Sequence, residues 1–232
     1  MSGYDATTEL LDWPSGRKVG EINGNSFCTR FRADGQQLVV HNEGLAIWQI
    51  WNVRSSEVCK QMIRPESAAG LIQPKGAWCG EISPDGRLLA IAGQQISLFD
   101  LSSGRCIGSL PDANSNTLMW LGSGNELWYA SASTSKLMRW TFAEKTPGVV
   151  TATLKGTIDN GGHRPLRMAA AEKGDRWALT TAMGFYHGRI SENSSTFVAP
   201  PTSFHSPALN PIALSSDGRF IFVSGDPASM AG

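Results

Sequence analysis

The stretch that most constrains the fold is residues 78–110, because weaker copies of it recur along the chain. It contains four short apolar runs separated by turn residues. Its first turn is Ser83-Pro84-Asp85-Gly86, in which proline presets a negative φ and glycine supplies the positive φ that starts the return strand. The run from Leu88 to Ile91 is apolar at every position, so both faces of this strand are expected to be covered. The stretch therefore predicts a four-stranded antiparallel meander that is packed on both sides.

Copies of the first turn recur at a regular distance along the chain. Their glycines are 51, 38, 50 and 44 residues apart, and they are Gly35, Gly86, Gly124, Gly174 and Gly218. This spacing is typical of sheets repeated around a central axis. We therefore expect an all-β fold, a β-propeller of about five blades formed by one domain over residues 1–232. Four blades are predicted at about 26–63, 77–110, 117–154 and 167–199, with a long connection over 155–165.

The two ends of the chain each contain half of the repeated unit. Residues 7–22 resemble third and fourth strands, and residues 212–224 resemble first and second strands. Together they would make one composite blade and close a five-bladed ring. The alternative is that the chain is a piece of a larger propeller, in which case both halves would have bare apolar edges.

Composition and charge exclude several classes of function. The 232 residues carry 20 basic and 20 acidic side chains, so the basic excess of a nucleic-acid-binding protein is absent. No apolar run is long enough to span a membrane and the start has no signal-peptide pattern, so we expect a soluble, cytoplasmic protein. The four cysteines lack the close pairs of a zinc or redox site, and they are interpreted as buried thiols.

The turn Ser83-Pro84-Asp85-Gly86, the run Ile96–Gly104 and the repeat length together resemble the WD-repeat family of β-propellers, with TolB-like propellers as the second resemblance. In that family the third strand ends in Trp-Asp, and the equivalents here are Trp51-Asn52, Phe99-Asp100, Trp140-Thr141 and Leu11-Asp12. The family's Gly-His pair appears once, as Gly162-His163, and Thr134 stands where the family has a turn aspartate. The resemblance therefore implies a degenerate WD propeller, with His163 bracing its blade.

The candidate site is the mouth of the central channel, where loops lead into the first strands. The residues just before those strands are Asn25, Lys75, Asn116, Arg164 and Asn210. A metal-dependent hydrolase would need carboxylates at these positions, and none is there. The asparagines are ordinary turn residues, although they could bind an ion weakly.

Two basic residues of this set have basic neighbours in the sequence. Lys75 and Arg164, with Arg64 and His163 nearby, could form a positive mouth for a phosphate or an acidic peptide. The alternative is that these are ordinary solvated loop charges.

No residue pattern predicts a catalytic group, a cofactor site or a metal site. The tryptophans in or beside strands are interpreted as packing between blades: Trp48, Trp51, Trp120, Trp128, Trp140 and Trp177. The leading hypothesis is a non-enzymatic scaffold that binds a protein or peptide, either alone or as the last part of a larger regulatory protein. The alternative is a propeller enzyme of the lactonase or hydrolase type, or a small-ligand sensor, with its site at the channel mouth.

Overall fold

The computed structural model describes residues 7–11, 15–23, 26–31, 35–42, 47–53, 58–63, 79–110, 115, 117–121, 125–146, 149–171, 173, 175–181, 183–199 and 212–223. Every regular element in these ranges is a β-strand, which confirms the predicted all-β class. The strands form four sheets of four strands and two sheets of two strands. All pairings are antiparallel, so each four-stranded sheet is a meander.

The four-stranded sheets are the four whole blades of the prediction. Blade one contains β3 (Ser26–Phe31), β4 (Gln37–Asn42), β5 (Ile47–Val53) and β6 (Val58–Ile63). Blade two contains β7 (Cys79–Ile82), β8 (Leu88–Ala92), β9 (Ile96–Asp100) and β10 (Cys106–Leu110). Blade three contains β11 (Leu118–Leu121), β12 (Glu126–Ser131), β13 (Lys136–Thr146) and β14 (Val149–Asp159). Blade four contains β15 (Pro165–Ala170), β16 (Trp177–Thr181), β17 (Gly184–Gly188) and β18 (Thr196–Val198).

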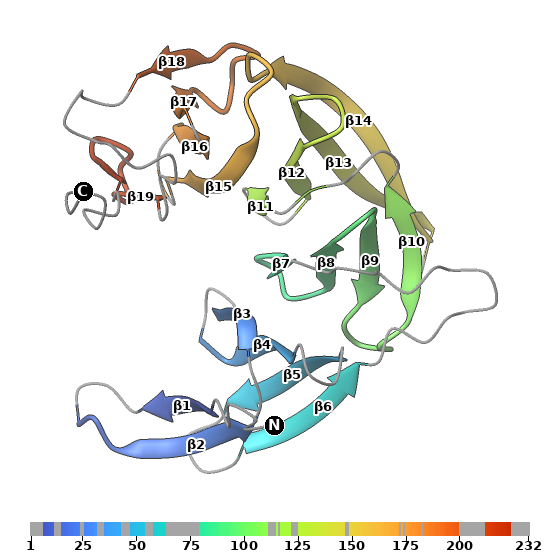
Figure 1. Ribbon diagram of the computed structural model, residues 1–232. Coiled ribbons are helices and arrows are strands. Elements are labelled where there is room, and N and C mark those ends of the chain that lie inside the picture. The colour runs from blue at the N-terminus through green and yellow to red at the C-terminus, as the bar shows by residue number, and fades with distance from the viewer. Residues whose placement is uncertain are drawn as a thin grey trace, which may run out of the picture.

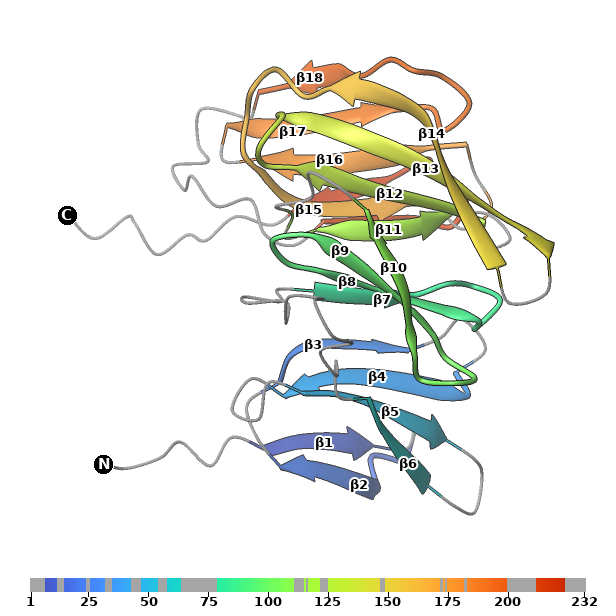
Figure 2. The same cartoon turned by 90° about the vertical axis from the view of Figure 1, so that its right-hand side faces the viewer.

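The blades follow one another around an arc. The first strands β3, β7, β11 and β15 lie on the inner side of the arc, and the last strands β6, β10, β14 and β18 lie on the outer side (Figure 1). Figure 2 shows the blades side by side in chain order. The fold is therefore a β-propeller, as the repeat spacing predicted.

Blade three is larger than the sequence indicated. Its last two strands are 11 residues long each and pair along almost their whole length. Residues 155–159, predicted to begin a long connection, continue β14, and blade four already begins at Pro165. The prediction of a connection over 155–165 was wrong because residues 156–159 pair with β13, which the repeat pattern did not reveal.

The first turns have the geometry that their glycines predicted. Gly35, Gly86 and Gly218 have φ values of 70°, 72° and 72°. In blade two the Gly86 amide donates to the Ser83 carbonyl at 2.8 Å, which closes the turn. These φ values lie in the left-handed region, which favours glycine.

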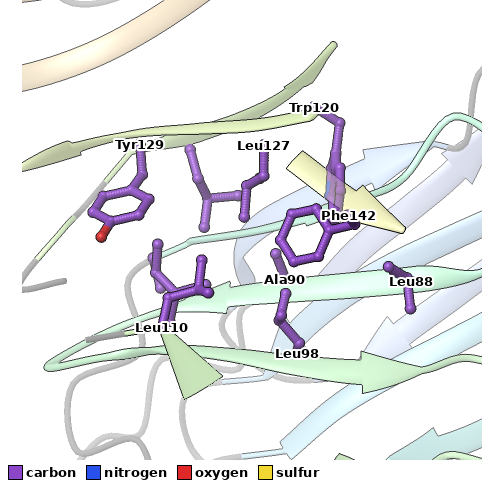
Figure 3. Packing of buried hydrophobic residues seen from close by; sticks show 11 residues of the cluster. Leu88, Ala90, Leu98, Leu110, Trp120, Leu127, Tyr129 and Phe142 are labelled. Atoms are coloured by element: carbon purple, nitrogen blue, oxygen red, sulfur yellow. The ribbon is translucent and has the colours of Figure 1, made fainter. Parts of the chain in front are cut away.

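The core lies between the blades. One cluster joins blades one and two, a second joins blades two and three, and a third joins blades three and four. Figure 3 shows the second cluster, in which Trp120, Leu127 and Tyr129 of blade three face Leu98 and Leu110 of blade two. Five of the six tryptophans belong to or pack against one of these three clusters, in agreement with their interpretation as packing between blades. Trp51 instead packs against Leu38 and Val40 of its own blade.

The remaining four strands form two half-blades. The N-terminal half-blade contains β1 (Thr7–Leu11) and β2 (Lys18–Asn23), and the C-terminal half-blade contains β19 (Ile212–Leu214) and β20 (Ile221–Val223). They lie at opposite ends of the arc (Figure 1) and form two separate sheets. The predicted composite blade of residues 212–224 and 7–22 is therefore not present as one sheet in this structure.

Each half-blade is held by a different neighbour. Leu10 of β1 packs against Leu38 and Val40 of blade one. At the other end, the backbone amide of Lys173 in blade four donates to the carbonyl of Ser216 at 2.8 Å. Each half-blade is a pair of strands, so β1 and β20 each keep one free edge among the described strands.

The described ranges contain no helix with the length and apolar character needed to cross a membrane.

Candidate functional site at the channel mouth

The described part of the channel mouth is formed by two loops that enter first strands. Ser115 precedes β11, and the segment 160–164 precedes β15. Each is hydrogen-bonded to the turn between the second and third strands of the preceding blade: Ser115 N donates to Gly93 O at 3.2 Å, and Asn160 N donates to Ser135 O at 3.4 Å. The same backbone hydrogen bond thus occurs in two successive blades, and each time it holds the loop that leads into the next blade.

Buried polar side chains hold these loops. Ser115 and Asn160 are both almost completely buried. The Ser115 hydroxyl donates to the Thr117 carbonyl at 2.7 Å, and the Asn160 amide nitrogen donates to the His163 carbonyl at 3.1 Å. These two side chains therefore bind the protein's own backbone and fix the loops at the mouth.

His163 is bonded inside its own blade. Its Nδ1 shares a hydrogen bond with the Tyr186 hydroxyl at 2.8 Å, and its ring contacts Phe197 with centroids 5.2 Å apart. Burial, together with the charge of Asp159, raises the pKa of Tyr186, so the phenol stays protonated at neutral pH. The contact with Tyr186 on β17 is what a bracing role for His163 requires. No pattern in the sequence singled out Tyr186 and Phe197, since aromatic residues in strands usually belong to the core.

The glycines of the Asn160–Arg164 segment permit this arrangement. Gly161 and Gly162 have φ values of +64° and +77°, and a Cβ on Gly161 would lie 2.4 Å from the Tyr186 hydroxyl oxygen. The Gly161 amide also donates to the Asp159 carboxylate at 2.7 Å. The double glycine therefore serves the approach of the loop to Tyr186.

Of the four residues predicted to form a positive mouth, two lie among the described residues. Arg164 is exposed next to the half-buried His163. Arg64 and Lys75, together with Asn25, Asn116 and Asn210, lie outside the described residues. The grouping of Arg64, Lys75, His163 and Arg164 consequently stays a prediction.

The turn that lacks the family's aspartate is held in another way. The Ser131 hydroxyl accepts a hydrogen bond from the Thr134 amide at 3.2 Å, and the exposed Thr134 side chain stands where the aspartate would be. Ser135 completes the turn with a φ of 54°. A buried serine thus replaces the missing carboxylate as the organiser of this turn.

A buried ion cluster lies away from the mouth, between blades three and four. Arg139 has a side chain that is only 3% exposed, and its guanidinium binds Glu126 at 3.1 Å and Asn193. The same guanidinium lies 4.5 Å from the centre of the Trp128 ring. Because these donors and acceptors bind one another, the cluster fastens residues 192–193 of blade four to blade three. Asn193 is the first residue of Asn193-Ser194-Ser195, which has the pattern of a glycosylation acceptor, and here its side chain binds Arg139 of the same protein.

The described residues contain no cluster of histidine, cysteine, aspartate or glutamate suited to a metal ion. They also show one shallow hollow, between the first turn of blade two and the β13–β14 hairpin, where Arg87 and Glu144 form an ion pair at 2.7 Å. This ion pair links neighbouring blades.

Comparison with known proteins agrees with the propeller architecture. No protein-family model and no curated protein matches the chain. Among solved structures, the β-propeller domain of Cps50 (Swd1) from Myceliophteria thermophila is similar, with a TM-score of 0.75 and 11% sequence identity. The similarity covers 94% of this chain and 74% of that domain. At this identity the likeness shows the fold, a β-propeller.

Proposed function

We propose that this protein is a non-enzymatic scaffold of the degenerate WD-repeat type that binds a protein or peptide at the channel mouth. The observation that carries the proposal is that the polar side chains described there, Ser115, Asn160 and His163, bind the protein itself. The Asn160 Oδ1 is buried without a hydrogen-bond partner, but each of the three side chains makes one hydrogen bond within the protein. A mouth held in this way suits presentation of a fixed surface better than proton transfer or metal binding. We also propose that the protein is cytoplasmic and binds neither nucleic acid nor membranes.

The proposed partner is an acidic segment. Arg164 is exposed at the mouth, and Lys75 and Arg64 stand in the sequence between β6 and β7. Arginine binds carboxylates through two parallel hydrogen bonds, and a basic mouth would favour an acidic peptide over a neutral one.

Charge reversal at the mouth tests this proposal. The full chain, carrying Lys75→Glu and Arg164→Glu, is used as bait in a cell extract, and the captured proteins are quantified against the unmodified chain. Arg105→Glu is the control, because Arg105 is exposed in the turn between the third and fourth strands, at the opposite end of blade two. We expect the mouth variant to capture at least tenfold less partner protein than the Arg105→Glu control, which should capture as much as the unmodified chain. Equal capture by both variants would exclude the mouth as the binding surface.

The alternative of an enzyme or small-ligand sensor is tested separately by thermal shift. Divalent metals, phosphosugars and nucleotides are added to the unmodified chain. A ligand at 100 times its dissociation constant stabilises the folded state by about 2.7 kcal/mol, which raises the melting temperature measurably. A shift with any of these compounds would favour the alternative over the scaffold.

A further inference from the structure

The outermost strand of blade three has a long free edge. β14 is 11 residues long, and among the described strands it pairs with β13 alone. Figure 2 views the arc from its outer side and shows β14 on the side that faces the viewer. The backbone groups on the outer edge of β14 therefore have no partner strand in the described part of the chain.

The outer strands of the other whole blades contain features that protect an edge from pairing. β6 contains Lys60, β10 has a bulge between Cys106 and Gly108, and β18 has three residues. Charges, bulges and shortness are means by which natural sheets avoid pairing edge to edge. Residues 149–154 of β14, with the sequence VVTATL, contain no charge, proline or glycine, and residues 150–154 pair with β13 without a bulge. This segment is therefore the least protected of the four outer edges.

The hydrogen bonds of blade three show which residues of β14 face the free edge. The Phe142 amide of β13 donates to the Asn125 carbonyl at 2.8 Å, so the backbone groups of Phe142 point toward β12. Successive residues of a strand point to opposite sides, so Ala143 points toward β14, where it pairs with Thr151. Thr151 is thus turned toward β13. The amide and carbonyl of the next residue, Ala152, consequently lie at the free edge.

The same alternation places the backbone groups of Val150 and Leu154 at the free edge beside those of Ala152. Val150 and Ala152 pack against the core between blades two and three, whereas the Leu154 side chain is 44% exposed. Unpaired backbone groups next to exposed apolar and β-branched side chains suit the addition of another strand.

The segment is complementary to itself. When two copies of a strand pair antiparallel about a two-fold axis, one residue lies opposite its own copy. With Ala152 on the axis, Val150 lies opposite Leu154 of the second copy, so the exposed leucine gains an apolar neighbour. Thr151 lies opposite Thr153, which is a favourable pair across strands. Residues 150–154 are uncharged, so no like charges oppose one another.

Registers shifted by one residue fit less well. With Thr151 on the axis, Leu154 would lie opposite residue 148, which precedes β14. With Thr153 on the axis, Thr151 would lie opposite Lys155, at the place where the register of β14 shifts. The register centred on Ala152 keeps both Leu154 and Thr151 opposite residues of their own kind.

We propose that two copies of this chain associate by antiparallel pairing of β14 with β14, with Ala152 opposite Ala152. The two blade-three sheets then form one continuous sheet, and the backbone groups at both edges are hydrogen-bonded. A single pair of strands buries a small area, which places this dimer among the weak, concentration-dependent associations. The surface is separate from the channel mouth and leaves the mouth free for a different partner.

A single cysteine tests the register. The four native cysteines are first replaced by alanine: Cys28, Cys59, Cys79 and Cys106. Ala152→Cys then places two thiols opposite each other, with Cα atoms about 5.5 Å apart, which a disulfide can bridge. The control is Thr157→Cys, an exposed position of the same strand that would lie about 30 Å from its own copy.

We expect the Ala152→Cys chain to form disulfide-linked dimers at least tenfold faster than the Thr157→Cys chain, at a rate that rises with protein concentration. Equal rates for the two chains would overturn the proposal. A melt under reducing conditions, compared with the cysteine-free chain, shows that each variant is folded.

Removal of one backbone amide tests the pairing without a crosslink. Ala152→Pro deletes an amide that faces the free edge, so the hydrogen bonds between β13 and β14 remain. Ala152→Ser keeps the amide and is the matched control. In sedimentation experiments the unmodified chain and the serine variant should dimerise alike, and the proline variant should have a dissociation constant at least tenfold higher. An unmodified chain that stays monomeric up to about 1 mM, or equal dissociation constants for the two variants, would contradict the proposal.

Discussion

At the scale of single residues, the interfaces between blades depend on a few close contacts. The buried Trp48 ring of blade one lies against Gly80 of blade two, and a Cβ at Gly80 would come within 2.6 Å of that ring. Tryptophan is too rigid and too enclosed there to move aside. Position 80 thus requires glycine because the Trp48 ring of the neighbouring blade leaves no room for a Cβ, and not because of its φ.

Gly80→Ala should destabilise the protein by about 1–3 kcal/mol, the usual cost of overpacking a core. Gly156→Ala is the matched control, because its Cβ would meet Asn193 at an ordinary 3.5 Å. Urea unfolding of both variants measures the difference. A Gly80→Ala chain as stable as the Gly156→Ala chain would refute the close packing of Trp48.

The ion pair of Glu126 with Arg139 predicts a dependence of stability on pH. Burial raises the pKa of Glu126, but hydrogen bonds from Lys155, Trp128 and Arg139 outweigh it, and the pKa is lowered from its ordinary value. Because the folded-state pKa is the lower one, this contribution to stability is complete above the unfolded-state pKa of about 4.3 and disappears as the pH falls through the folded-state pKa.

Glu126→Gln should cost about 3 kcal/mol at pH 7, because it leaves the buried Arg139 guanidinium without its counter-charge. The difference from the unmodified chain should shrink below about pH 4, where Glu126 itself becomes protonated. Denaturant unfolding between pH 3 and 7 checks both statements. Lys155→Ala is the control: the Lys155 side chain is 48% exposed, and its loss should cost less than about 1 kcal/mol. A stability difference between the Glu126→Gln variant and the unmodified chain that stays constant with pH would contradict the role of the ionised Glu126 carboxylate.

At the scale of elements, the same first turn occurs in two environments. Ser83 is completely buried, whereas Ser215, which makes the equivalent bonds, is half-buried at the end of the arc. An amide that loses its partner pays the full cost of desolvation only where water cannot replace that partner. Burial of the turn, more than its sequence, should therefore set its contribution to stability.

Ser83→Ala should cost about 1–3 kcal/mol because it leaves the buried Leu88 amide without an acceptor. Ser215→Ala removes the same bonds and should cost less than about 1 kcal/mol, since water can reach the Phe220 amide. Thermal unfolding of the two variants gives the comparison. Equal losses would contradict the dependence of the turn's contribution on its burial.

At the scale of the whole molecule, each blade is stabilised mainly by its neighbours. The clusters of buried residues lie between successive blades, so no sheet has a core of its own. Such coupling between nearest neighbours is typical of repeat proteins, in which strands at the outer edge open most easily.

Native-state hydrogen exchange should follow this order. The amides of β8, β12 and β16, the almost completely buried second strands, should exchange most slowly. The amides of β18, which is short and largely exposed, should exchange at least tenfold faster. Equal protection of β16 and β18 would show that blade four opens as a unit, contrary to the expectation.

The sequence by itself determined the features that depend on a few adjacent residues. The positive φ of Gly35, Gly86 and Gly218 and the covered second strands follow from local turn chemistry and from uninterrupted apolar runs. For the same reason the four whole blades could be located from their turns and apolar runs, whereas the fifth turn, at Gly218, belongs to a half-blade. Of the candidate site, the Gly162-His163 pair singled out His163, whose Nδ1 bonds to Tyr186 in its own blade, and its bracing role stays a prediction.

The tertiary structure alone decided the features that join distant segments. Tyr186 as the partner of His163, Asn193 as a partner of Arg139, and the extension of β14 to Asp159 depend on how neighbouring strands and blades pack. The separation of the two half-blades is a feature of the same kind. Local propensity makes each half of a blade, but whether β20 meets β1 depends on the angles between all the blades that lie between them.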